Sequence, residues 1–149
     1  MEQLAAALKV ALGNTFVMYS KSHSYHWNVE GTNFPQFHEF FGDLYEEVYG
    51  AVDPIAEAIR TLNVYAPISV TDIVSSSSIE EDKMKPADLR VMLNNLLAAN
   101  GEVLNALNRA LQAATQANKQ GIVNFLAGRI EIHDKHNWML TSSLKSVGA

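Results

Sequence analysis

Apolar side chains recur every three or four positions through four stretches of the chain, and this spacing predicts amphipathic helices. The stretches run over residues 2–28, 34–62, 86–116 and 120–144. Pro35 and Pro86 suit the first turn of a helix, because that turn does not use the backbone N–H that proline lacks. Pro54 lies inside the second stretch and removes one hydrogen bond there, so we expect a kink or a strained turn.

The periodicity lapses over residues 63–85, between the second and third predicted helices. Within this segment Ser69 and Asp72 have the spacing of a helix N-cap, which predicts a short helix through Val74. One long connection combined with two short ones is typical of the ferritin-like four-helix bundle. We therefore expect a single all-α domain over residues 1–149, with a long crossover that contains a short helix.

Composition and charge narrow the chemistry. The chain has no cysteine, so a metal ion would have to be held by oxygen atoms and imidazole nitrogens. The net charge of −5 opposes binding to a nucleic-acid backbone unless cations gather on one surface. Neither a basic leader nor an apolar run of about 20 residues is visible, and we expect a soluble, cytoplasmic protein with no membrane partner.

Asp53 and Glu57 are the first candidate ligands. They are four residues apart on a predicted helix, so their carboxylates project from one face about 6 Å apart, a spacing suited to one cation. Two solvated acids are the alternative, and Arg60 is placed to pair with Glu57.

His26 and His38 are the second candidates. They flank the short loop between the first two predicted helices, so the fold brings them close together. His23 shares a helix face with His26. A hydrogen-bonded polar cluster without a metal is the alternative interpretation.

The geometry of the helix determines whether the two histidines and the two acids could bind the same metal ion. From His38 to Asp53 is about 22 Å along one helix, although their directions around the axis differ by only about 60°. They cannot share an ion within one chain. An antiparallel two-fold dimer through this helix would bring His38 of one subunit to the acids of the other, and would do so twice.

The candidate ligands lie within motifs that resemble a known family. The motifs are Tyr25-His26-Trp27-Asn28-Val29-Glu30-Gly31, Asn33-Phe34, His38-Glu39, Asp53-Pro54-Ile55-Ala56-Glu57 and Asp134-Lys135-His136-Asn137-Trp138-Met139-Leu140. Together they are similar to the signature of the mini-ferritins called DNA-binding proteins from starved cells (Dps). The resemblance covers nearly the whole chain.

The resemblance implies a hollow homododecamer that oxidises ferrous iron at ferroxidase centres between subunits. Peroxide or oxygen would be the oxidant, and stored ferric mineral would protect against oxidative damage. By position, His26 binds the first iron with Asp53 and Glu57 of the two-fold mate. His38 serves the second iron, with Glu57 bridging. Trp27 either intercepts oxidising equivalents or simply packs.

The chain also departs from the family pattern. Family members usually carry an acid four residues after the second histidine, where this chain has Gly42, so we expect one strong and one weak iron position. Asp43 is turned about 100° away and should not replace that acid. Glu46 is about 80° from His38 and near the expected two-fold axis, as an iron relay or as a pair of repelling acids.

Other departures concern iron entry and DNA. Residues 118–124 lack the acids that line an entry pore in the family, and no lysine-rich tail precedes the first helix, so we do not expect DNA binding. A non-enzymatic Dps-like shell, or a scaffold that binds DNA or a partner with a degenerate metal centre, is the alternative that Gly42 favours. Ferritin and bacterioferritin proper use Glu-x-x-His repeats, which are absent.

His133 and His136 lie three apart on the last predicted helix. They either bind a metal at the surface or are ordinary helix residues.

Overall fold

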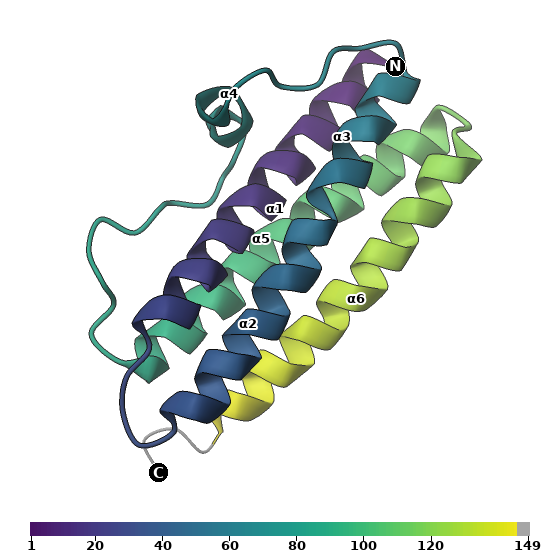
Figure 1. The fold of residues 1–149 in the computed structure, drawn as a ribbon. Coiled ribbons are helices and arrows are strands. Elements are labelled where there is room, and N and C mark those ends of the chain that lie inside the picture. Colours follow the sequence, from purple (N-terminus) through teal and green to yellow (C-terminus); the bar gives the residue numbers. More distant parts are fainter. Residues whose placement is uncertain (146–149) are drawn as a thin grey trace.

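A computed structural model of the chain describes residues 1–145. The elements are α1 (Glu2–Asn28), α2 (Phe34–Gly50), α3 (Val52–Thr61), α4 (Val70–Ser75), α5 (Leu89–Gln116) and α6 (Gln120–Leu144). Four long rods run side by side, one of them made of α2 followed by α3 (Figure 1). The expected all-α, ferritin-like bundle with a short helix in its crossover is confirmed.

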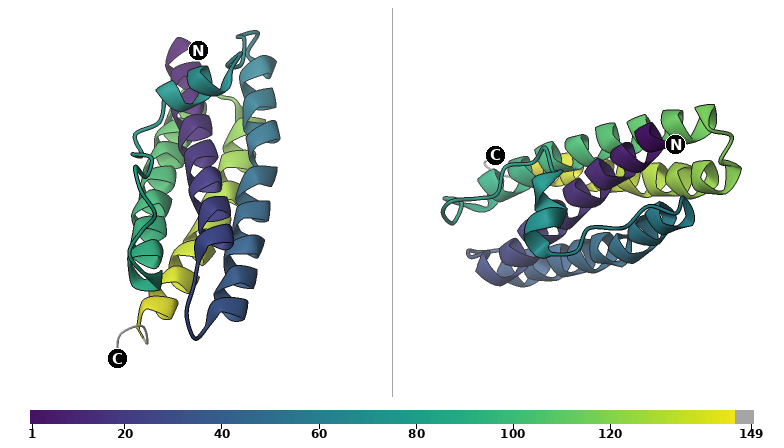
Figure 2. Two further views of the ribbon diagram at one scale, coloured as in Figure 1. Left: turned by 60° about the vertical axis from the view of Figure 1, so that its left-hand side comes forward. Right: turned by 90° about the horizontal axis from the view of Figure 1, so that it is seen from above.

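The crossover between α3 and α5 follows the outside of α1 (Figure 2). Asn14, which is buried on α1, donates to Ser78 and accepts from Ser77 and from the Ser78 backbone N–H. Beside it, a Cβ added at Gly13 would lie 2.8 Å from the carbonyl oxygen of Ile73. Only glycine lets α4 approach α1 this closely.

The rod formed by α2 and α3 is interrupted at Ala51. The N–H of Ala51 donates to Val48 O, three residues back, and the four-residue pattern resumes when Ile55 donates to Ala51 O. Pro54 has no N–H to offer Gly50, which explains an interruption three residues before the proline. The expected irregularity is thus present, and it separates Asp53 and Glu57 on α3 from His38 on α2.

Side-chain caps set two of the helix starts. The Ser69 hydroxyl accepts a hydrogen bond from the Asp72 N–H at 3.1 Å and opens α4. Asp88 accepts from the Val91 N–H at 3.0 Å, so α5 begins at Leu89, three residues later than the expected start at Pro86.

Leucine, isoleucine, methionine and aromatic side chains from all four rods fill the bundle interior. Fully buried members include Leu8, Met18, Phe41, Ile55, Leu93 and Leu107. Among residues 1–145, no helix is both long enough and apolar enough to cross a membrane.

Candidate metal centre

His26 and His38 form an interlocked pair where α1 turns into α2. Their rings stack with centroids 3.8 Å apart and planes 14° from parallel. The Nδ1 atom of His26 lies 2.6 Å from His38 O, and the Nδ1 atom of His38 lies 2.6 Å from His26 O. Because a carbonyl oxygen only accepts, each Nδ1 carries the hydrogen. This hydrogen-bond pattern selects the tautomer in which the lone pair lies on Nε2, as it does in histidines that ligate metals.

Gly42 makes room for this pair. A Cβ atom added there would lie 3.1 Å from both Cε1 and Nδ1 of His26, which is tighter than an ordinary contact. The His26 ring is held by its hydrogen bond and by the stack, so it has little freedom to retreat. A side chain at position 42 would therefore push the His26 ring out of its present place.

Asp53 and Glu57 are both exposed on α3. Glu57 lines a shallow groove between α3 and the start of α6, with Phe125 among its neighbours. Arg60, whose spacing would allow a pair with Glu57, instead donates to Val64 O at 3.0 Å and lies over the ring of Tyr65. The two carboxylates are left facing solvent.

The single chain brings the two histidines together and leaves the two acids elsewhere. Within residues 1–145 no three histidine or acidic side chains are grouped closely enough to hold a metal ion. Glu46 is exposed, and Asp43 lines a groove with Trp138 and Met139 of α6. Asp43 thus faces a different helix from residue 42, which faces His26. The set of ligands shared between subunits stays a prediction.

An aromatic cluster adjoins the histidine pair along α1 and α2, and spacing alone did not reveal it. The ring of His23 stacks on Tyr45 at 3.8 Å and lies 4.1 Å from Trp27, whose side chain is 63% exposed. The hydroxyl of Tyr19 is 3.0 Å from Nδ1 of His23. Burial, followed by the neighbouring His26, lowers the pKa of His23. His23 is therefore neutral at pH 7 and can accept the Tyr19 proton in that hydrogen bond.

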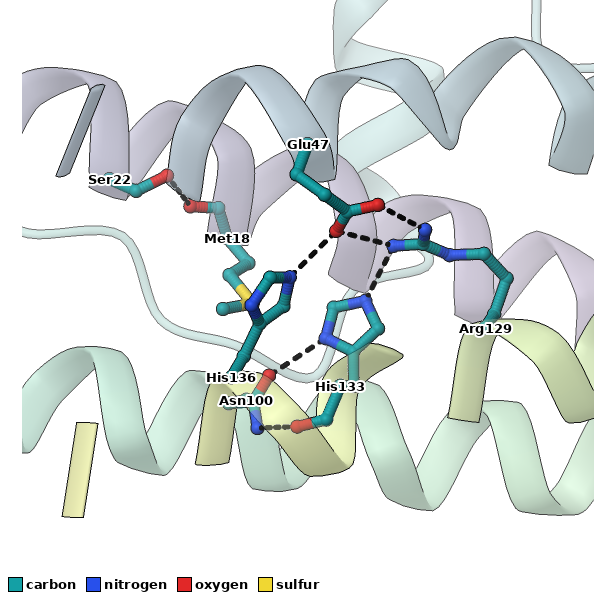
Figure 3. A network of polar contacts seen from close by, with 7 residues as sticks. All are labelled: Met18, Ser22, Glu47, Asn100, Arg129, His133 and His136. Carbon is teal, nitrogen blue, oxygen red and sulfur yellow. Dashed lines mark hydrogen bonds and ion pairs between the residues drawn. The ribbon is translucent and has the colours of Figure 1, made fainter. Parts of the chain in front are cut away.

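A second histidine cluster lies inside the bundle, and Figure 3 shows that its members point toward one another from three helices. The guanidinium of Arg129 donates to both carboxylate oxygens of Glu47 and, at 2.9 Å, to Nε2 of His133. His133 donates from Nδ1 to Asn100 at 2.7 Å. His136 donates from Nε2 to Glu47 at 2.6 Å. We call these five residues the interior network.

The pKa values of the interior network follow from these contacts. Burial opposes ionisation of Glu47, but hydrogen bonds from His136 and Arg129, with the Arg129 charge, outweigh it and lower the Glu47 pKa to about 2. Burial, and then the Arg129 charge, lowers the pKa of His133 to about 3. The Arg129 guanidinium therefore contacts both the Glu47 carboxylate and the neutral imidazole of His133.

The suggestion of a surface metal at His133 and His136 is wrong. His133 is fully buried and the side chain of His136 is only 12% exposed, and both are occupied by partners of the interior network. Spacing suggested a surface pair because it could not reveal Glu47, which comes from a helix more than 80 residues earlier in the chain.

Comparison with known proteins agrees with this architecture. The model of the ferritin-like domain matches residues 5–147. The "DNA protection during starvation protein" of Brevibacillus brevis is 30% identical, with 97% of each chain covered. The crystal structure of Dps from Staphylococcus aureus is 28% identical with a TM-score of 0.90, covering 97% of this chain and 96% of that one.

A further solved structure adds a chemical description. Dps from Vibrio cholerae O1, 27% identical with a TM-score of 0.90 over 96% of this chain and 89% of that one, is described as belonging to a broad superfamily of ferritin-like diiron-carboxylate proteins. The family model spans nearly the whole chain, and the relatives match along their length. The chain belongs to the Dps mini-ferritins within the ferritin-like family.

Proposed function

We propose that this protein oxidises ferrous iron with hydrogen peroxide at sites shared by two subunits, and stores the ferric product inside a homododecameric shell. The observation that carries the proposal is the histidine pair. Reciprocal Nδ1 hydrogen bonds to backbone carbonyls fix the orientation of both imidazoles and leave each Nε2 atom without a hydrogen-bond partner among residues 1–145. A polar cluster that served only packing would not need two lone pairs left open in this way.

The acids complete the donor set only if a second subunit supplies them. Imidazole and carboxylate together suit iron, which is the substrate here, in both its ferrous and ferric states. Asp53 and Glu57 are exposed on the same rod as His38, roughly 22 Å farther along it. An antiparallel two-fold contact along this rod brings the acids of the partner subunit to the histidine pair, at two equivalent places.

Gly42 makes the two iron positions unequal. The first position has His26 with Asp53 and Glu57 of the partner subunit. The second has His38 and the bridging Glu57 but no further carboxylate, because residue 42 is glycine and Asp43 faces α6. We expect one strong and one weak position, the weak one completed by water.

The test is the rate of iron oxidation by variants that still assemble. Asp53→Ala and Glu57→Ala should each slow peroxide-driven Fe(II) oxidation by about 100-fold or more, since each removes a direct ligand. Glu131→Ala, which removes an exposed acid from α6, is the matched control and should oxidise iron normally. Native mass measurement verifies that all three keep the shell. Normal oxidation by both α3 variants would reject the site.

A non-enzymatic shell is the second candidate, and Gly42 is the observation that favours it. A shell that has lost its centre would leave Fe(II) oxidation at the rate of free iron and would show no metal at His26 in a crystal soaked with Fe(II) or Zn(II). Direct DNA binding is not part of our proposal, because the net charge is −5.

A further inference from the structure

The aromatic cluster beside the histidine pair contains a hydrogen-bonded tyrosine and histidine. The Tyr19 hydroxyl is 3.0 Å from Nδ1 of His23, and both side chains are half-buried between α1 and α2. His23 is one helical turn from His26, and their ring centroids are 6.2 Å apart. A phenol loses an electron far more readily when a base within hydrogen-bond distance takes its proton at the same time.

Two routes of closely spaced rings connect Tyr19 to the candidate metal ligands. In one route Tyr19 lies 5.6 Å from His23, which lies 6.2 Å from His26. In the other Tyr19 lies 6.1 Å from Tyr45, which lies 5.4 Å from His26. Every centroid separation is within the range of ordinary aromatic contacts, so an electron never has to cross a wide gap.

We propose that Tyr19, with His23 as its proton acceptor, is a one-electron donor to the iron site. The inference rests on the function proposed above. It answers a problem that Gly42 creates: peroxide needs two electrons, whereas a site that firmly holds one ferrous ion supplies one. A single electron would release hydroxyl radical, the damaging product that such a protein should avoid.

The electron balance closes with Tyr19 included. One Fe(II) becomes Fe(III), Tyr19 gives the second electron, and its hydroxyl proton moves to Nδ1 of His23. Hydrogen peroxide accepts both electrons and two protons from solvent, its O–O bond breaks, and two water molecules form. A second Fe(II) then reduces the tyrosyl radical, which recovers its proton from His23. The net reaction oxidises two ferrous ions per peroxide.

Tyr19 is better placed for this step than the other oxidisable side chains of the cluster. Tyr45 stacks face to face on His23, so its hydroxyl is not directed at an imidazole nitrogen. Among residues 1–145, neither Tyr49 nor Trp27 forms a hydrogen bond with an imidazole, whereas the Tyr19 hydroxyl does. Tyr19 combines partial burial with a base already in contact.

The experiment mixes the assembled protein with one Fe(II) per subunit and excess peroxide, followed by freeze-quench electron paramagnetic resonance. The wild type should give a tyrosyl radical signal that disappears when further Fe(II) is added. Tyr19→Phe should lower the signal at least about tenfold and raise spin-trapped hydroxyl radical. His23→Phe, which keeps a ring on Tyr45 but removes the base, should also lower the tyrosyl signal about tenfold. Tyr65→Phe, an exposed tyrosine on the crossover, is the control and should match the wild type.

The outcomes separate this inference from the proposed function. Fast iron oxidation without a tyrosyl radical, or a tyrosyl signal that persists in Tyr19→Phe, would overturn the role of Tyr19 and leave the ferroxidase proposal standing. A radical confined to Trp27 would do the same. Iron oxidation no faster than that of free iron in the wild type would overturn both.

Discussion

The two histidine clusters of this chain contain similar side chains, but they differ in whether the polar atoms of those side chains have partners within the chain. In the interior network, Arg129 donates to Glu47 and His133 and His136 donates to Glu47, so the carboxylate is paired within the chain. At the candidate metal centre, only the Nδ1 atoms of His26 and His38 are hydrogen-bonded, to backbone carbonyls, and their Nε2 atoms have no hydrogen-bond partner among residues 1–145.

Residue type therefore does not by itself identify a metal site. A histidine and carboxylate cluster with its own internal cation is closed and contributes to a unique packing of the core. A cluster that fixes its tautomers and leaves lone pairs open is prepared for a cation from outside. The interior network is thus the closed cluster, and the pair formed by His26 and His38 is the open cluster.

The largest expected effect is on the closed cluster. Arg129→Leu strands the Glu47 carboxylate beside His136 and removes the donor to His133, so the free energy of unfolding should fall by about 3 to 5 kcal/mol. Arg109→Leu, on the exposed face of α5, should change it by less than about 0.5 kcal/mol. Urea denaturation at one protein concentration measures both. A loss of less than about 1 kcal/mol for Arg129→Leu would show that the network is not closed as described.

The next effect is on the open cluster. Gly42→Ala places a Cβ against the His26 ring and should weaken Co(II) or Zn(II) binding about tenfold, because it displaces a ligand rather than removing one. Gly101→Ala, where a Cβ meets nothing within 4 Å, is the matched control and should stabilise α5 slightly. Calorimetric titration reads the affinity. Unchanged binding in Gly42→Ala would show that His26 can move freely.

Lowering the pH should reduce the free energy of unfolding mainly through the closed cluster. The folded-state pKa values of His133 and Glu47 are about 3 and about 2, both below their unfolded values. The unfolded chain therefore binds protons first, and stability is lost as pH falls from about 6.5 for His133 and from about 4.5 for Glu47.

The measurement is the urea midpoint as a function of pH. His133→Gln should flatten the decline between pH 6.5 and 5, where Glu47 does not yet contribute. An identical slope in the variant and the wild type over that interval would contradict the buried, neutral state of His133.

The smallest expected effect is the loss of stability when one histidine of the metal centre is removed. His38→Ala removes one stacked ring and one hydrogen bond at a partly exposed position, and should lower the free energy of unfolding by about 1 kcal/mol. Thermal unfolding measures it. A loss comparable to that of Arg129→Leu would mean that the pair serves packing rather than metal binding.

The fold was largely predictable because its signals are local. Periodicity located the four rods, Ser69 with Asp72 located the short helix, and Pro54 indicated the break at Ala51. Motif resemblance led to the right family.

The candidate site was predictable in part. The turn between α1 and α2 places His26 beside His38, and loop length alone suggested that. The contact of Gly42 with His26, the Tyr19 to His23 hydrogen bond and the interior network depend on side-chain packing, and the network joins helices more than 80 residues apart. Linear spacing does not carry such information.

Subunit mixing tests the shared site most directly. His26→Ala and Asp53→Ala shells should each be inactive alone. If they are co-expressed, half of randomly formed dimers contain one of each, and every mixed dimer keeps one intact site out of two. The mixed shells should therefore recover about one quarter of the wild-type rate of Fe(II) oxidation. No recovery above the two separate variants, in shells shown by mass to contain both, would contradict a site built from two subunits.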